Sequence, residues 1–388
     1  MKRTFFTRKI RRKLRALFVL LLFCGAIYFV SSYVVDRAVL NFSIRAYVHN
    51  AFDRVRGIAN TDSLRWVGEP GTEFFSFDNH IISVSNREIK YFDFHMNEIT
   101  SLPLGYTNPK VRITHPYMVV ADKGGNEWVL VRGRTIVFTG ETEENIANFD
   151  VAENGFVTMV KESRRAKHDV FVYDTRGNVL YTYASTRDFV YAAMYSPQMR
   201  AVLLNKITVA STTVGSIFEA HDIREDRETM VFSHPRGGDV FPEWGILNGN
   251  MVYAYSDRSL FVLNRRGEEV MEVDLQPGIS VCTVTNQGSI AITRTITSEE
   301  AGTTMSVVEI YNSNGRRRGT FEFDGNFRSI TSYNNIICVS TGNDFLFLSE
   351  SGRLQGRISS ENELLGIITI RNNTVFAKIR NGLIIKQL

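Results

Sequence analysis

The stretch Val170–Tyr183, VFVYDTRGNVLYTY, decides the fold, because variants of it recur along the chain. The same design appears at Leu260–Val273 (LFVLNRRGEEVMEV), Val307–Phe323 (VVEIYNSNGRRRGTFEF) and Phe345–Ile358 (FLFLSESGRLQGRI). In each, an apolar strand leads into a polar turn that supplies Gly or Asn where a positive φ is needed, and a second strand follows. Recurrence about every 40–50 residues predicts a repeat architecture, and all-strand units of that length are β-propeller blades.

Working outward from these hairpins divides the chain into successive four-stranded blades. The predicted blades are Phe74–Leu104, Val111–Thr139, Ile146–Tyr183, Phe189–Phe232, Glu243–Leu275, Gly278–Asp324 and Phe327–Ser359. The remaining segment, Leu364–Leu388, supplies only three strands and would leave an open edge, which natural sheets avoid. Placing the isolated strand Leu64–Val67 beside Leu383–Leu388 completes an eighth blade and closes the ring. We therefore expect an all-β, eight-bladed propeller over residues 63–388, with seven blades as the alternative if the terminal strands pack elsewhere.

The residues before the propeller predict a membrane anchor. Residues 1–15 hold eight bases and no acid, and Ala16–Val35 (ALFVLLLFCGAIYFVSSYVV) contains no charge. About 20 apolar residues span a bilayer as a helix, and a basic flank places its own end in the cytoplasm. A cleavable signal peptide is the alternative, although Val30–Ser32 is a poor cleavage site.

The segment that follows, residues 36–62, has an apolar stripe at helical spacing and predicts an amphipathic stalk. The expected topology is therefore a single-pass protein of a cell membrane with a cytoplasmic N-terminus and an extracytoplasmic propeller.

Charge and cysteine content limit the partners. Without the first fifteen residues, 37 bases stand against 41 acids, so the net basic footprint of a nucleic-acid-binding domain is missing. Three cysteines cannot build a disulfide framework. An extracytoplasmic domain that needs no disulfide suits a bacterial envelope.

No catalytic or metal-binding motif occurs in the sequence. It lacks HxH, HExxH and CxxC patterns, a nucleophile elbow, a P-loop and a dinucleotide-binding fingerprint. The acidic and basic residues from His221 to Glu228 are interpreted as a solvated turn, because a calcium loop needs alternating oxygens and a turn glycine. We expect no enzyme activity, no cofactor and no metal.

One short motif and the overall layout carry a family resemblance. Tyr195-Ser196-Pro197 followed by Arg200–Leu204 resembles the turn between the first two strands of TolB-like and WD40-like blades, with Gln198-Met199 replacing the usual Asp-Gly. The succession of basic head, anchor, stalk and repeats resembles an uncharacterised family of bacterial single-pass membrane proteins with a propeller ectodomain. That resemblance implies a topology and no reaction.

Three long connections predict a binding face. They are Lys161–His168, Ser233–Pro242 and Thr297–Thr304, and the topology of a propeller brings such connections to one rim. Loops on a rigid scaffold carry function disproportionately often. The candidate residues are Lys161, Arg164, Arg165, Lys167, His168, His234, Arg236, Asp239 and Trp244. The sequence thus favours a non-catalytic module that binds an envelope protein or a cell-wall polymer. The alternative is a ligand-sensing or glycan-processing propeller with a site over the central channel.

Overall fold

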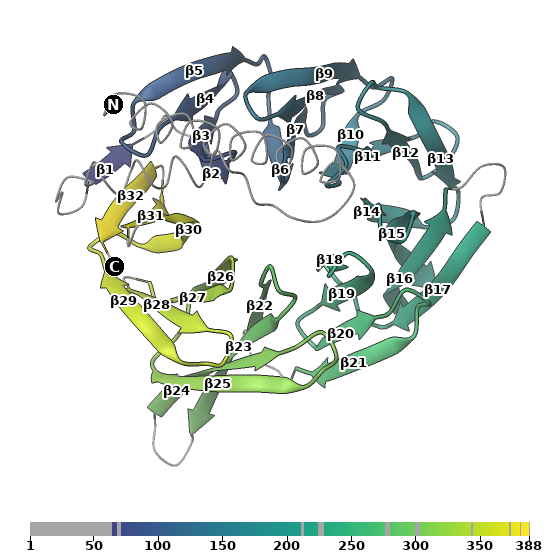
Figure 1. The fold of residues 1–388 in the computed structure, drawn as a ribbon. Coiled ribbons are helices and arrows are strands. Elements are labelled where there is room, and N and C mark those ends of the chain that lie inside the picture. The colour runs from purple at the N-terminus through teal and green to yellow at the C-terminus, as the bar shows by residue number, and fades with distance from the viewer. Residues whose placement is uncertain are drawn as a thin grey trace, which may run out of the picture. The chain divides into compact units, whose positions relative to one another are not determined.

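The computed structural model describes residues 64–67, 71–210, 213–223, 229–275, 280–298, 303–342, 344–371, 374–380 and 382–387. The chain divides into two compact units, Met1–Ala59 and Asn60–Leu388, and every described residue belongs to the second. The described residues form 32 strands in eight four-stranded antiparallel sheets around a central axis (Figure 1). The prediction of an eight-bladed, all-β propeller is confirmed.

The predicted anchor at residues 16–35 and the stalk at residues 36–62 lie outside the described residues. Within the part that is described, no helix has the length and apolar character that a membrane crossing requires.

The strands of each blade are called A to D from the axis outward. Blade 1 contains β2 (Glu73–Phe77), β3 (His80–Val84), β4 (Glu88–Phe92) and β5 (Glu98–Pro103). Blade 2 contains β6 (Pro109–Thr114), β7 (Tyr117–Asp122), β8 (Glu127–Arg132) and β9 (Thr135–Glu141). Blade 3 contains β10 (Ile146–Val151), β11 (Val157–Glu162), β12 (His168–Tyr173) and β13 (Val179–Ser185). Blade 4 contains β14 (Phe189–Ser196), β15 (Ala201–Ala210), β16 (Thr213–Asp222) and β17 (Thr229–Gly237).

The second half of the ring repeats this plan. Blade 5 contains β18 (Glu243–Leu247), β19 (Met251–Tyr255), β20 (Ser259–Leu263) and β21 (Glu269–Asp274). Blade 6 contains β22 (Ser280–Val284), β23 (Ile290–Ser298), β24 (Thr303–Tyr311) and β25 (Arg317–Asp324). Blade 7 contains β26 (Ser329–Tyr333), β27 (Ile336–Ser340), β28 (Asp344–Ser349) and β29 (Leu354–Ser359). Blade 8 contains β30 (Leu364–Arg371), β31 (Thr374–Ile379), β32 (Gly382–Gln387) and, as its outer strand, β1 (Leu64–Val67).

The recurring hairpins of the sequence are the C–D hairpins, and their turns share one chemistry. In blade 3, Asp174 Oδ1 accepts the backbone N–H groups of Arg176 and Asn178, each at 2.8 Å. Gly177 occupies the position where φ is +82°. A side-chain oxygen at the first turn residue and a glycine at the left-handed position favour this compact turn.

Each of these turns leads into a β-bulge at the start of the outer strand. In blade 3, Val172 and Tyr173 pair with Tyr181 and Val179, which leaves Leu180 without a partner on β12. The described strands of blades 1 to 7 all have this bulge, and the extra residues are Ile99, Val137, Leu180, Val231, Val270, Arg318 and Gln355. A bulge bends the strand that carries it and increases its local right-handed twist.

The ring closes through strands from both ends of the chain. β1 pairs antiparallel with β32, from Leu64 opposite Ile385 to Val67 opposite Gly382. This is the predicted closure by mixed termini, and it gives the last sheet its fourth strand.

Antiparallel pairing gives the ring two distinct rims. The A–B and C–D turns emerge at one rim, called the A–B rim. The B–C turns and the connections from D to the next A strand emerge at the other, called the B–C rim. The hydrophobic core lies between adjacent blades, where residues from neighbouring sheets form shared clusters such as the one around Phe218 and Phe261.

Two details of the sequence interpretation are corrected by the strand bounds and burial. Ser233–Gly237, predicted as part of a loop, belongs to β17, because blade 4 has longer strands than its neighbours. His221, assigned to a solvated turn, lies in β16 and is only 8% exposed, while residues 224–228 lie outside the described residues.

Candidate functional site

The predicted binding segments emerge at the B–C rim. Lys161–His168 contains the B–C turn of blade 3, and Gly238–Pro242 connects blade 4 to blade 5. Thr297–Thr304 joins β23 to β24, and its residues 299–302 lie outside the described part of the chain. Segments far apart in sequence thus share one side of the ring, as propeller topology requires.

The turn of blade 3 carries an exposed basic group. Arg164, Arg165 and Lys167 are all exposed. Arg164 Nε lies 2.7 Å from Glu144 Oε1, although its side chain remains 83% exposed. Lys167 Nζ lies 4.8 Å from the ring centroid of Phe189. Arg165 makes no ion pair with any described residue, so its guanidinium is available to a partner.

Two residues of the same segment point inward. Lys161 is 7% exposed, and its ammonium lies 4.4 Å from the ring centroid of Phe171, a favourable cation–π geometry. His168 packs edge-on against Phe189. Burial lowers the pKa of His168, and the opposing charges of Glu162 and Asp169 do not offset it. Lys161 and His168 therefore support the turn from beneath. The exposed side chains of Arg164, Arg165 and Lys167 form its surface.

The candidates on blades 4 and 5 join those blades to each other. Arg236 lies 4.6 Å over Phe261 and pairs with Glu269 and Glu272 of β21. His234 packs on Phe261, and burial followed by the Arg236 charge lowers its pKa. These contacts lie at the interface between blades 4 and 5, so they join the two blades.

Asp239 and Trp244 also have partners within the ring. Asp239 Oδ2 accepts a hydrogen bond of 2.7 Å from Ser256, which fixes the connection between blades 4 and 5. Trp244 is only 7% exposed, because it lies in the inner strand β18 and packs in the cluster around Phe218. Trp244 is therefore buried between the blades, and Asp239 is half-buried in the connection at the B–C rim.

A hollow lies at the B–C rim where the ring closes. It measures about 490 Å³ and is lined by residues of blades 8, 1 and 2. Lys110 and Lys378 approach the two oxygens of Glu73 at 3.4 and 3.7 Å, and Arg380 is an exposed neighbour. Positive charge exceeds negative charge in this hollow, as it does on the turn of blade 3.

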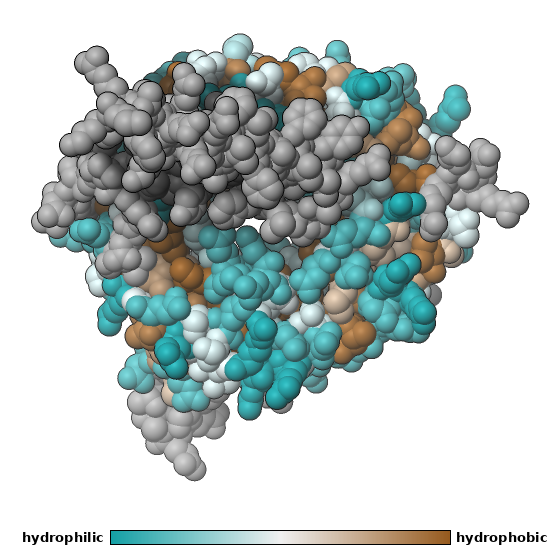
Figure 2. Space-filling view, in the orientation of Figure 1, coloured by the Kyte–Doolittle hydropathy of each residue, from teal (hydrophilic) through white to brown (hydrophobic). Residues whose placement is uncertain are grey.

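A pocket of about 480 Å³, called the axial pocket, lies at the inner ends of blades 2 to 6. Most of its residues are the last residues of the A strands or belong to the A–B turns, so it lies towards the rim opposite the predicted face. Trp244 and Tyr253 reach it from within β18 and β19. Hydrophilic residues dominate around the axis on the face shown in Figure 2, and hydrophobic residues gather towards the outer edge.

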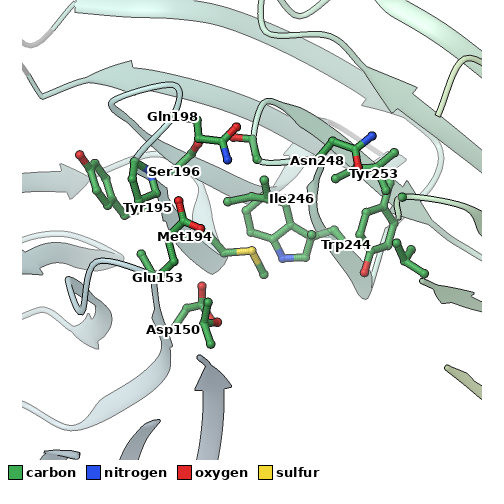
Figure 3. Close-up of a pocket in the computed structure, with 18 of the residues that line it drawn as sticks. Asp150, Glu153, Met194, Tyr195, Ser196, Gln198, Trp244, Ile246, Asn248 and Tyr253 are labelled. Atoms are coloured by element: carbon green, nitrogen blue, oxygen red, sulfur yellow. The ribbon is translucent and has the colours of Figure 1, made fainter. Parts of the chain in front are cut away.

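The axial pocket combines carboxylates with aromatic side chains. Figure 3 shows Asp150 and Glu153 on one side of Met194, and Trp244 between Met194 and Tyr253. Burial raises the pKa of Asp150 to about 7, against the opposing effects of the Arg112 charge and of the Val151 backbone N–H. Asp150 as a residue is half-buried and belongs to the lining of the pocket.

Sequence reasoning missed the axial pocket because its residues serve as ordinary turn formers. Asn248 has a φ of +51°, and its amide lies where a Cβ on Gly288 of the next blade would be. The side-chain amide of Gln198 likewise lies where a Cβ on Gly249 would be. The recurrence of Asn and Gln in the A–B turns is the sequence feature that could have indicated this pocket. Each of these residues, taken alone, is explained by its role in forming a turn.

Metal and thiol chemistry receive no support from the described residues. They contain no group of three or more side chains that could hold a metal ion. Cys282 and Cys338 are free thiols, and burial raises the pKa of both, to about 12 for Cys282. Such thiols are unreactive at neutral pH and pack as small hydrophobic residues.

Solved structures with a similar fold are propellers. BamB from Moraxella catarrhalis matches with a TM-score of 0.53 and 13% identity, over 84% of this chain and 99% of that one. The WD40 domain of SCAP from fission yeast matches with a TM-score of 0.51 and 10% identity, over 84% of this chain and 97% of that one. At such identities the likeness shows the fold alone. A comparison with curated proteins finds no match.

A family model covers nearly the whole propeller. Residues 54–384 match the model of DUF5711, which is described as a family of unknown function. The matched range includes both strands that close the ring, β1 and β32, apart from the last residues of β32. The chain belongs to the DUF5711 family.

Proposed function

We propose that the protein is a membrane-anchored, extracytoplasmic binding module of a bacterial envelope, and that it acts without catalysis. The B–C rim would bind an acidic envelope protein or an anionic wall polymer. The observation that carries this proposal is the exposed turn Ser163–Lys167, whose Arg164, Arg165 and Lys167 project from a rigid rim.

The construction of the rim supports a docking role. Lys161 and His168 are packed against aromatic rings beneath the turn, so the exposed charges are held by an ordered base. The hollow at the ring closure adds Lys110, Lys378 and Arg380 on the same rim. Charges at the edge of an interface raise association rates and make binding sensitive to salt.

Charge reversal tests the binding face. Arg164→Glu together with Arg165→Glu is expected to reduce crosslinking-assisted capture of the partner from membranes and to flatten its salt dependence. Arg265→Glu with Arg266→Glu is the matched control, because these adjacent exposed arginines lie in the C–D turn of blade 5 at the opposite rim. Thermal unfolding should be nearly equal, since exposed charges contribute about 0–1 kcal/mol each. Loss of capture in the control pair alone would place the binding face on the A–B rim.

Topology is tested separately. Alkaline phosphatase fused after the last residue is expected to be active, and a fluorescent protein that matures only in the cytoplasm is expected to be dark. The reverse pattern would contradict an extracytoplasmic propeller, whatever the B–C rim binds.

A further inference from the structure

We propose that the axial pocket is a second binding site, for an uncharged saccharide end. Five blades contribute to it, and its volume of about 480 Å³ is within the range of small-molecule sites. It lies at the opposite rim from the basic turn of blade 3, so this site and the proposed docking face are independent.

The pocket offers hydrogen-bond acceptors. Asp150 ends the inner strand β10, and Glu153 follows in the exposed A–B turn. No basic side chain is among the residues that line the pocket, and the nearest opposing charge on Asp150 comes from Arg112 of β6. These carboxylates are therefore open to hydroxyl or amide donors of a ligand.

The pocket also offers donors that have no partner in the described protein. Trp244 is more than nine-tenths buried, yet its indole N–H makes no hydrogen bond to any described residue. The hydroxyl of Tyr253 makes none either, and burial followed by the nearby Cys282 raises its pKa, so it stays protonated. Figure 3 places both rings on the same side of the pocket. Both residues line the pocket, so a ligand or water there can accept a hydrogen bond from each donor.

This combination selects among ligand classes. Anionic ligands are disfavoured by Asp150 and Glu153. A simple cation would satisfy the carboxylates and leave the Trp244 and Tyr253 donors unmatched. Saccharide hydroxyls donate and accept at once, and the apolar face of a sugar ring packs on aromatic and thioether groups, here Trp244 and Met194.

The test uses the purified full chain in a detergent without a sugar headgroup. Cellotetraose, maltotetraose and chitotetraose are titrated by calorimetry, with tetralysine as the cationic comparison. At least one oligosaccharide is expected to bind, and Asp150→Asn and Tyr253→Phe should each weaken it about tenfold, or about 1.4 kcal/mol. Glu162→Gln, an exposed change at the B–C rim, should leave the affinity unchanged.

The pH dependence of saccharide binding gives a second readout. The groups that act on Asp150 are Arg112 of β6 and the Val151 backbone, with Glu153 as the next carboxylate along the chain. Ionised Asp150 makes stronger, charge-assisted bonds to hydroxyl donors, so saccharide affinity should rise between about pH 6 and 8. Asp150→Asn should abolish that rise.

The outcomes are distinct. Absence of binding by all three oligosaccharides would overturn the proposal, as would binding that neither substitution weakens. Displacement by tetralysine would instead assign the pocket to a cation. If Asp150→Asn fails to fold in a thermal-unfolding control, Glu153→Gln at the exposed turn replaces it. None of these results bears on partner capture at the B–C rim.

Discussion

Blade 4 packs on its two neighbours in two different ways. Towards blade 5 it presents Phe218, whose ring centroid lies 5.7 Å from that of Phe241 and 5.2 Å from that of Phe261. Towards blade 3 it presents Lys206, which lies 2.6 Å from Glu219 and 3.5 Å from Asp188. The interface with blade 5, called the aromatic seam, is dominated by aromatic rings. The interface with blade 3 is also apolar over much of its area, but it contains a buried ion cluster as well, called the ionic seam.

The two seams come from the same strands by simple alternation. In β16, Phe218 and Ala220 belong to the cluster shared with blade 5, whereas Glu219 and His221 lie on the other face. His221 Nε2 lies 3.0 Å from Glu219 Oε2, and the His221 ring packs on Tyr183 of blade 3. Alternation along a strand fixes which residues face each neighbouring blade, and an interface that is largely apolar can also hold a buried ion cluster.

The aromatic seam should show the largest loss of stability. Phe218→Ala removes a ring that contacts three other aromatic side chains, and phenylalanine-to-alanine changes in cores cost about 3–5 kcal/mol. Denaturant unfolding at several pH values measures it. The loss should be the same at acid and neutral pH, and a loss below about 1 kcal/mol would show that the seam repacks.

Breaking the ionic seam should cost slightly less. Lys206→Met leaves Glu219 and Asp188 buried without their cation, and such losses are about 3–5 kcal/mol, with the lower end expected here because His221 still contacts Glu219. Adding Glu219→Gln to Lys206→Met should recover part of the loss, because a neutral amide needs no cation. Equal stability of the single and double variants would contradict a coupled cluster.

Acid should weaken the contacts of Glu219 in the ionic seam. Burial by itself would raise the pKa of Glu219, but hydrogen bonds from His221 and Lys206 outweigh it, and the pKa lies below the ordinary value of 4.5. A lowered folded-state pKa contributes stability that is present above pH 4.5 and is lost as the pH falls through the folded value. The stability gap between wild type and Glu219→Gln should therefore narrow below about pH 4, and a constant gap would speak against this assignment.

The smallest effect is expected at the outer edge of the aromatic seam. Arg236→Gln removes contacts with Glu269 and Glu272, but these side chains are 22%, 30% and 47% exposed. Solvent screening limits such pairs to about 0–1 kcal/mol. A loss of several kcal/mol, measured by thermal unfolding, would mean that the cation–π contact of Arg236 with Phe261 dominates.

The sequence predicts the ring better than its interior. Blade boundaries and the pairing of Leu64–Val67 with the last strand follow from local turn chemistry and from the rule that edges must be covered. Lys206 and Glu219 could not be recognised as buried, because a polar residue that alternates with apolar ones normally faces solvent. Their burial depends on blade 3, which no local pattern reveals.

The candidate sites show the same difference between features that the local sequence determines and features that depend on neighbouring blades. The basic turn of blade 3 is visible locally, and its exposure follows from its position between two strands. The sequence predicts Trp244 as an interface residue, but its place in β18 directs it to the aromatic seam and the axial pocket. The axial pocket needs five blades to be brought together, so only the closed ring reveals it.

The pairing of β1 with β32 has a consequence for synthesis. Leu64 and Ile385 are partners although 321 positions separate them in the chain. At about 5–20 residues per second, a ribosome needs roughly 15–60 s to make the intervening protein. Throughout that interval β1 exists without its hydrogen-bonding partner, and any nascent chain released before residue 382 can never acquire it. Completion of the polypeptide is therefore built into the fold as a condition for a finished ring, and prematurely terminated chains would expose a strand that quality-control proteases and chaperones can recognise.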